Sequence, residues 1–138
     1  MTRRQSREHI FKMLFCRDFY TGEEWKEQAE QYLDSLELPA GQDALTEEER
    51  EELLTKAEAV SLKAAELDEK IDRAAEGWKT RRMGKVDLTI LRLALYEMEY
   101  DEKIPTKVAI NEAVDIAKKF GGDESPGFVN GILARLVD

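Results

Sequence analysis

The stretch IPTKVAINEAVDIAKKFGGDESPGFVNGIL, residues 104–133, is the most informative part of the sequence, because it predicts two helices joined by a tight turn. Pro105 ends the element that precedes it. In the first predicted helix, apolar side chains recur at helical spacing at Val108, Ala109, Ile110, Ala113, Val114, Ala117 and Phe120. In the second, a continuous apolar face is formed by Phe128, Val129, Ile132, Leu133 and Leu136.

The turn between these helices is predicted from its small and polar residues. Gly121 and Gly122 stand where a helix C-terminus favours a left-handed residue. Ser125 is expected to cap the next helix, and Pro126 suits its first turn. Gly131 falls in mid-helix, where glycine costs about 1 kcal/mol relative to alanine. We therefore expect another helix to pack closely against its bare backbone.

Three capping-box patterns predict helix starts in the first half of the chain. Each pairs a threonine with Gln or Glu three residues later: Thr2 with Gln5, Thr21 with Glu24, and Thr46 with Glu49. The first two predict helices over about 3–20 and 22–37. The segment Leu-Pro-Ala-Gly at 38–41 breaks the chain after them.

The remaining segments complete an all-α architecture. The segment 47–82 is too long for one uncapped helix, so we expect a division near residues 60–64. Gly84 precedes a helix over about 86–101, and the two helices described above follow it. The sequence therefore predicts seven helices and no strands in a single domain over 1–138.

Composition argues against several classes of protein. No segment approaches 18 uninterrupted apolar residues, so we expect no membrane span. The N-terminal arginines are followed by Glu8, His9 and Lys12 rather than by the apolar region of a signal peptide. A single cysteine, Cys16, cannot form an internal disulfide framework. These features lead us to expect a cytoplasmic protein.

The formal net charge of −9 is unevenly distributed. Residues 1–20 hold five basic and two acidic side chains, whereas residues 21–76 hold six basic and eighteen acidic ones. A second basic group without an intervening acid is formed by Lys79, Arg81, Arg82 and Lys85. Charges separated by more than about 8–10 Å are largely screened, so a local basic patch can bind a polyanion on an acidic protein.

The arginines near the N-terminus form the first candidate site. On a helical wheel, Arg3, Arg4 and Arg7 fall in the same sector as the apolar side chains Ile10, Phe11, Leu14 and Phe15. One interpretation is a set of surface salt bridges to the acidic middle of the chain. The other is a phosphate-binding patch, which Lys12 or Lys85 would extend, because guanidinium groups match phosphate oxygens and stack on bases.

The turn before the last predicted helix forms the second candidate site. The backbone N–H groups of residues 125–127 are available to a phosphate or a base edge. Phe128 is either a core residue or a ring on which a base stacks. Asp123 and Glu124 disfavour phosphate, which indicates base-edge or protein contacts instead.

Other polar residues give no sign of catalysis. His9 is the sole histidine and has no companions for a metal site, and Cys16 has no histidine near it in sequence. A solvated helix end is the expected setting of the acids Glu97, Glu99, Asp101 and Glu102. The chain has no phosphate-cradling glycine loop, nucleophile elbow or metal-spaced ligand set. We therefore expect no enzyme, no catalytic residue, no metal and no cofactor.

Three motifs carry a resemblance to a known family. INEAVDIAKKFG from residue 110, followed by S-x-x-FVNGIL from residue 125, is similar to the C-terminal signature of the NusB family of bacterial transcription antitermination factors. W-x-x-x-RM-x-x-VD-x-x-ILRLALYE, residues 78–97, looks like its central signature, and RRQSREHIFKMLF, residues 3–15, resembles its arginine-rich opening. The resemblance implies two packed helical subdomains, over about 1–82 and 83–138.

The resemblance also implies a function. Members of the family bind boxA RNA of ribosomal RNA operon transcripts together with the ribosomal protein NusE, and act with other Nus factors on RNA polymerase. Combined with the charge pattern, it predicts RNA contacts at Arg3, Arg4, Arg7, Lys12, Lys85, Ser125 and Phe128. It places Phe15, Asp87 and Arg92 on the side that faces the protein partner, where Leu88 stands at a position often occupied by arginine.

Two other functions stay open at this stage. A NusB-like fold also occurs as an appended domain of some RNA cytosine methyltransferases. Alternatively, the chain is a protein-binding helical adaptor without RNA binding, whose N-terminal arginines pair with the acidic segment 47–76. Self-association varies among NusB-like proteins, so the sequence leaves a homo-oligomer open.

Overall fold

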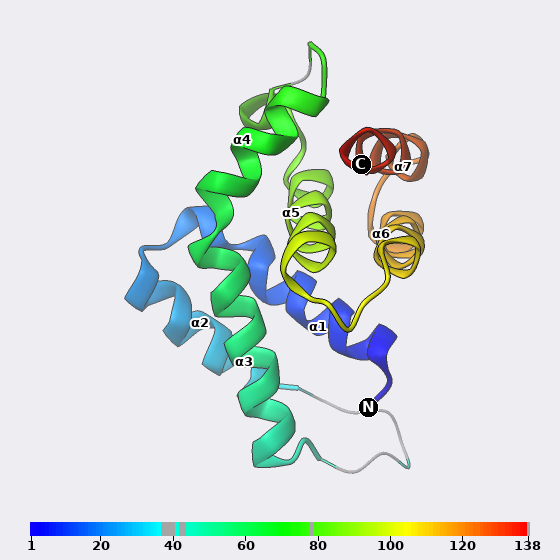
Figure 1. Ribbon diagram of the computed structural model, residues 1–138. Coiled ribbons are helices and arrows are strands. Elements are labelled where there is room, and N and C mark those ends of the chain that lie inside the picture. Colours follow the sequence, from blue (N-terminus) through cyan, green and yellow to red (C-terminus); the bar gives the residue numbers. More distant parts are fainter. Residues whose placement is uncertain (37–40, 42–43, 78, 138) are drawn as a thin grey trace. The chain divides into compact units, whose positions relative to one another are not determined.

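The computed structural model describes residues 1–36, 41, 44–77 and 79–137, and within these ranges it contains seven α-helices and no strand. In Figure 1 the helices are α1 (Arg3–Phe15), α2 (Gly22–Asp34), α3 (Glu47–Leu62), α4 (Ala64–Ala74), α5 (Lys85–Tyr100), α6 (Thr106–Phe120) and α7 (Ser125–Leu136). Two short 3-10 helices, η1 (Arg17–Phe19) and η2 (Thr80–Arg82), lie in the connections. The predicted all-α class with seven helices is confirmed.

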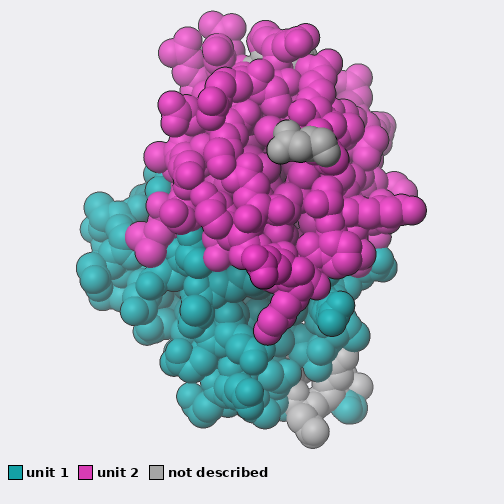
Figure 2. Space-filling view, viewed as in Figure 1, with its two compact units in different colours: residues 1–61 teal, residues 62–138 magenta. Residues whose placement is uncertain are grey.

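Contacts between Cα atoms divide the chain into two compact units, unit 1 (residues 1–61) and unit 2 (residues 62–138), which Figure 2 colours separately. This division falls earlier in the chain than the subdomain boundary expected near residue 82, because α4 packs against α5 and α7. The division into subdomains over 1–82 and 83–138 stays a prediction.

Unit 1 contains α1, α2 and α3. Its core side chains are Ile10, Phe11, Met13, Leu14, Trp25, Ala29, Leu33, Leu53, Ala57 and Val60. The buried indole of Trp25 donates a hydrogen bond from Nε1 to the backbone oxygen of Met13 at 2.8 Å. Because this bond satisfies the one polar group of the indole, Trp25 joins α2 to α1 without a desolvation penalty.

Two of the three predicted capping boxes are present. The hydroxyl of Thr2 accepts from the Gln5 N–H at 3.1 Å, and the Gln5 side chain accepts from the Thr2 N–H at 2.8 Å. Thr46 and Glu49 exchange the same two bonds, both at 3.0 Å. Thr21 makes no side-chain cap bond, so the prediction of a capping box between Thr21 and Glu24 is wrong. The helix α2 nevertheless begins at the next residue, Gly22.

The helices of unit 1 are shorter than predicted. Cys16 has a ψ of 5°, and its carbonyl accepts from Phe19 at 3.0 Å, so the chain tightens into η1 and α1 ends at Phe15 rather than near 20. The second helix ends at Asp34 rather than at 37. Most of the predicted break at 38–41 lies outside the described residues. Gly41, which is described, has a φ of +88°, a conformation that favours glycine.

Unit 2 is organised around α5, which packs against α4, α6 and α7 (Figure 1). Buried side chains occur on nearly every side of it, at Leu88, Thr89, Ile90, Leu91, Arg92, Leu93, Ala94, Leu95 and Glu97. A helix buried on all sides lies at the centre of a core. The predicted division of the segment 47–82 is also confirmed, because α3 ends at Leu62 and α4 begins at Ala64.

Glu97 corrects one expectation about the end of α5. We expected it in a solvated helix end, but its side chain is only 1% exposed. It lies one turn after the buried residues Leu93 and Ala94 and therefore on the same face. Glu99 is exposed as expected and forms an ion pair with Lys70 of α4.

The helices α6 and α7 confirm that residues 104–133 form two helices joined by a turn. Their buried faces consist of Ala109, Ala113, Ile116 and Ala117 on α6, and Val129, Ile132 and Leu133 on α7. Gly131 is exposed, and a Cβ atom added to it would have no neighbour within 4 Å. The prediction that another helix packs closely against Gly131 is wrong. The side of α7 that packs consists of apolar residues next to this glycine. None of the described helices combines the length and apolar character that a bilayer span requires.

Candidate nucleic-acid interface

The basic residues of α1 differ in exposure. Arg3, Arg4 and Lys12 are exposed, as a phosphate-binding patch requires. Arg7 is only 4% exposed and in this differs from the other two arginines. Its burial follows from the helical repeat, because Ile10 and Phe11, three and four residues later, belong to the core. A contact of Arg7 with RNA stays a prediction.

Three exposed aromatic side chains lie at the end of α1, at the end of η1 and directly after η1. Phe15 is 39% exposed, Phe19 67% and Tyr20 39%. Sequence reasoning identified Phe15 but missed the other two, since the predicted helix over 3–20 did not anticipate η1. Three aromatic residues within the short segment FCRDFY were the available signal. Because large apolar side chains grouped on a surface mark interaction sites, this aromatic group is a candidate protein contact in unit 1.

His9 and Cys16 lie near this segment but show no catalytic arrangement. The Nδ1 atom of His9 lies 2.9 Å from the hydroxyl oxygen of Tyr32. Burial, followed by the charge of Lys12, lowers the pKa of His9 below its usual 6.5, against the smaller opposing effect of Glu8. Burial raises the pKa of the Cys16 thiol, which reduces its reactivity. No group of three or more His, Cys, Asp or Glu able to hold a metal ion occurs in the described ranges.

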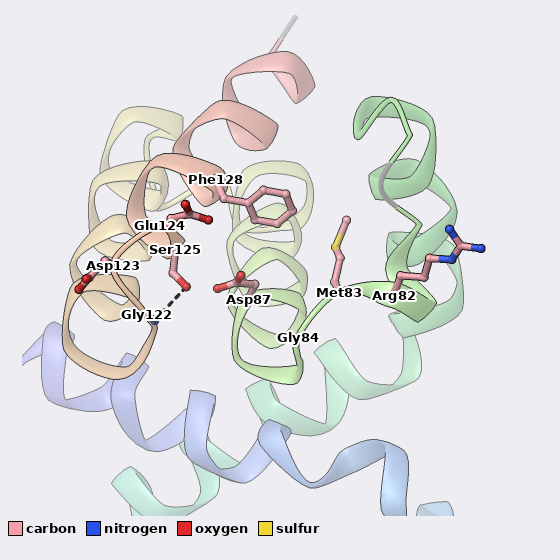
Figure 3. Close-up of a pocket in the computed structure, with 9 residues that line it drawn as sticks. All are labelled: Arg82, Met83, Gly84, Asp87, Gly122, Asp123, Glu124, Ser125 and Phe128. Atoms are coloured by element: carbon pink, nitrogen blue, oxygen red, sulfur yellow. Dashed lines mark hydrogen bonds between the residues drawn. The ribbon is translucent and has the colours of Figure 1, made fainter.

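Unit 2 contains a cavity of about 570 Å³ between the beginnings of α5 and α7, shown in Figure 3 and called here the α5–α7 cavity. It is lined by Arg82, Met83, Gly84, Asp87, Gly122, Asp123, Glu124, Ser125 and Phe128. Two predicted RNA contacts, Ser125 and Phe128, are thus brought together with Asp87, which was predicted to face a protein. The volume falls within the range of about 300–1,000 Å³ that is usual for small-ligand sites.

Phe128, which the sequence left open as a core residue or a base-stacking ring, is neither fully buried nor fully exposed. It is half-buried on α7, next to the fully buried Val129. Its ring nevertheless lines the α5–α7 cavity, and Figure 3 shows it facing the same space as Asp87 and Met83. The ring is therefore held in place by packing while one part of it remains available to a ligand.

The turn between α6 and α7 is held by a close approach of Gly121 to Ser125. Gly121 has a φ of −94°, so the left-handed conformation that we expected is absent. A Cβ atom at Gly121 would lie 2.5 Å from the Cβ of Ser125 and 2.8 Å from the carbonyl oxygen of Ala117. Any larger residue at position 121 would collide with these atoms, so glycine is needed here. Ser125 is the first residue of α7 rather than its cap, because its hydroxyl accepts from the Gly122 N–H at 3.1 Å and braces the turn.

The second basic group extends from η2 to the first residue of α5 and is anchored through η2. Its side chains are all exposed: Lys79, Arg81, Arg82 and Lys85. Between them Thr80 is buried, and its N–H donates to Oδ1 of Asp72 at 2.6 Å. Trp78, the first residue of the central motif, lies outside the described residues. The anchored η2 thus presents a fixed backbone with basic side chains at its surface.

Asp87 and Arg92, both predicted on the partner-facing side, have different surroundings in unit 2. Arg92 is 7% exposed, and its Nε and terminal nitrogen donate to the two carboxylate oxygens of Asp68, each at 2.7 Å. Asp87 instead lines the α5–α7 cavity. Leu88 is 3% exposed and belongs to the core. Partner contacts of Phe15, Asp87 and Arg92 stay predictions.

A model of the NusB family matches residues 4–138, nearly the whole chain. The chain belongs to the NusB family. Transcription antitermination protein NusB of Lachnoclostridium phytofermentans is 49% identical over 138 residues, which cover all of both chains. The protein of the same name from Agathobacter rectalis is 51% identical over 137 residues, 99% of this chain and all of the relative.

Solved structures agree with this assignment. A structure of T. maritima NusB matches with a TM-score of 0.82 and 33% identity, covering 99% of this chain and 90% of that one. A second match, in a structure described as a plectonemic RNA supercoil, has a TM-score of 0.79 at 21% identity and supports the fold alone. The family resemblance inferred from the three motifs and the NusB-like fold are thereby confirmed. Membership of NusB, a family of antitermination factors, also confirms that the chain is not an enzyme.

Proposed function

We propose that this NusB-family protein is a cytoplasmic transcription antitermination factor that binds boxA-type single-stranded RNA together with NusE. In this proposal it acts with other Nus factors on RNA polymerase that transcribes ribosomal RNA operons. The observation that carries the proposal is its identity of 49% and 51%, over the full length, to two transcription antitermination proteins. The same similarity favours antitermination over the methyltransferase alternative.

Unit 1 supports RNA binding through its exposed cations. Arg3 and Arg4 lie in the first turn of α1, and Lys12 lies in its last turn. Guanidinium groups form paired, charge-assisted hydrogen bonds with phosphate oxygens. These side chains carry no base specificity, so in this proposal they supply affinity for the backbone of the RNA.

Unit 2 supports recognition of a base through the α5–α7 cavity. Single-stranded RNA is recognised when a splayed base stacks on an aromatic ring and forms hydrogen bonds along its edges. Phe128 supplies such a ring, and Arg82 and Lys85 near the cavity supply positive charge for the adjacent phosphates. Asp123 and Glu124 also line the cavity and repel phosphate. The cavity therefore suits a base better than a phosphate group.

A transcription assay with purified components tests this function. RNA polymerase, NusE and the other Nus factors transcribe a template with boxA upstream of a terminator, and readthrough is measured with and without this protein. We expect the protein to raise readthrough on the boxA template and not on a template with a scrambled boxA. Stimulation that is equal on both templates would support the protein-binding adaptor instead, and no stimulation would contradict the proposal.

A further inference from the structure

We propose that the acidic first turn of α3, at Glu47 and Glu48, keeps double-helical RNA away from the basic first turn of α1. This proposal rests on the proposed function, because it concerns the RNA that binds at Arg3 and Arg4. A flexible single strand follows the cations and turns away from the carboxylates, whereas a stiff duplex meets both. The two glutamates thus select single strands at this surface.

The first turns of α1 and α3 lie close together within unit 1. The backbone nitrogen of Met1 is 3.7 Å from Oε2 of Glu49. Arg3 comes two residues after Met1, so its backbone lies within about 11 Å of this carboxylate, because each residue spans at most about 3.6 Å. This separation is close to the screening length, which is about 10 Å at about 0.1 M salt. The charges of the two turns therefore act on the same bound strand.

The two turns carry opposite charge. The first turn of α1 has no acidic residue, and its side chains Arg3 and Arg4 are exposed. The first turn of α3 contains three glutamates, Glu47, Glu48 and Glu49, and the first two are exposed. Phosphates bound at the arginines therefore lie near carboxylates, and like charges repel each other.

Glu49 has a structural task in α3 that its two neighbours do not share. Its side chain accepts from the Thr46 N–H at 3.0 Å and closes the capping box. This hydrogen bond holds the pKa of Glu49 below its usual value, so the carboxylate is ionised at neutral pH. The carboxylates of Glu47 and Glu48 make no hydrogen bond or ion pair with any residue that the structure describes. Both can therefore lose their charge while the cap of α3 is kept.

The stiffness of the nucleic acid decides how strongly it meets this repulsion. Double-stranded DNA carries one negative charge per about 1.7 Å of helix axis. Its persistence length of about 50 nm far exceeds the separation of the two turns, so it does not bend between them. A duplex that docks on Arg3 and Arg4 therefore places phosphates near Glu47 and Glu48. A single strand is flexible and places only the phosphates that the arginines hold.

A short RNA without boxA, used alone and annealed to its complement, tests the proposal. Fluorescence anisotropy gives its affinity for the natural protein and for the double variant Glu47→Gln with Glu48→Gln. The variant should bind the duplex roughly fivefold more tightly than the natural protein does, because two repelling charges are removed. Its affinity for the single strand should change less than about twofold, because that strand avoids the carboxylates. The gain for the duplex should grow as the salt concentration is lowered, since the screening length increases.

A matched control is the double variant Glu23→Gln with Glu24→Gln, which removes two charges from the exposed first turn of α2. It has the same net charge as the α3 variant and loses the same favourable interaction with a helix N-terminus. Its duplex affinity should stay within about twofold of that of the natural protein. Urea denaturation of both variants shows that the fold is kept.

The outcomes separate this proposal from the proposed function. If the α3 variant binds the duplex no more tightly than the natural protein, or gains equally for duplex and single strand, Glu47 and Glu48 do not select single strands. An equal gain in the α2 variant would show an effect of net charge alone and would also overturn the proposal. If the natural protein binds neither this RNA nor boxA RNA, the proposed function itself fails.

Discussion

Asp68 on α4 holds Arg92 on α5 through two hydrogen bonds of 2.7 Å, with each carboxylate oxygen accepting one. The side chain of Arg92 is 9% exposed and that of Asp68 24%. The paired geometry matches the planar guanidinium to the carboxylate, so the interaction orients one helix against the other within unit 2. The Arg92 guanidinium is thus already hydrogen-bonded to Asp68 within unit 2.

Removing the carboxylate should destabilise the protein strongly. Asp68→Ala removes the carboxylate that accepts two hydrogen bonds from the buried Arg92 guanidinium, and breaking a buried pair in this way costs about 3–5 kcal/mol. We expect a loss near 3 kcal/mol, because Asp68 keeps some solvent contact. Glu58→Ala is the control, since it removes an exposed pair with Lys26 at 3.7 Å and should cost less than about 1 kcal/mol. Equal losses in urea denaturation would contradict this role of Asp68.

Two glycines should respond to alanine with opposite signs. Gly121→Ala places a Cβ atom 2.5 Å from the Ser125 side chain, so overpacking should cost about 1–3 kcal/mol. Gly131→Ala adds a methyl group in open space within a helix and should stabilise by up to about 1 kcal/mol. Thermal melts of the two variants measure both effects. A raised melting temperature for Gly121→Ala would show that the turn rearranges without cost.

Two arginines of α1 should respond differently to alanine. Arg4 should affect RNA binding alone, whereas Arg7 should affect both RNA binding and stability. Arg4→Ala should weaken RNA binding and leave stability within about 0.5 kcal/mol, because the side chain is exposed. Arg7→Ala should also lower the free energy of unfolding, by about 1–3 kcal/mol, because the packing of a buried side chain is lost. Filter binding and urea denaturation on each variant give the two quantities. Full RNA affinity in Arg4→Ala would remove this residue from the interface.

Much of the fold follows from local signals, and its exceptions have physical reasons. Apolar spacing predicted α6 and α7, because each buries one face. Gly131 was misjudged because a glycine in mid-helix gives the same sequence signal whether it packs or faces water. The burial of Arg7 follows the helical repeat, which places it on the same face as Ile10 and Phe11.

The candidate site could be predicted only in part. Ser125 and Phe128 were found because they stand in a recognisable turn. The proximity of these two residues to Asp87 could not be predicted, because α5 and α7 are brought together only by packing around the core of unit 2. Phe19 and Tyr20 were missed because η1 exposes them beyond the end of α1.

His9 should make stability depend on pH. Its pKa in the folded protein is below 6.5, mainly because of burial, so the unfolded chain takes up the proton first as the pH falls. The stabilisation is therefore complete above pH 6.5 and decreases as the pH falls from there through the folded-state pKa. Urea denaturation between pH 8 and 5 should show this loss in the natural protein and not in His9→Gln. A difference between the two proteins that stays constant with pH would contradict the assignment.

If the exposed cations bind the phosphates of single-stranded RNA, the affinity for boxA RNA must fall as salt is added, and a salt titration of the natural protein measures this fall. Three to five phosphate contacts predict a slope of roughly −2 to −3.5 when the logarithm of the binding constant is plotted against that of the salt concentration. We expect a slope in this range for boxA RNA. An affinity that does not change between low and physiological salt would contradict it.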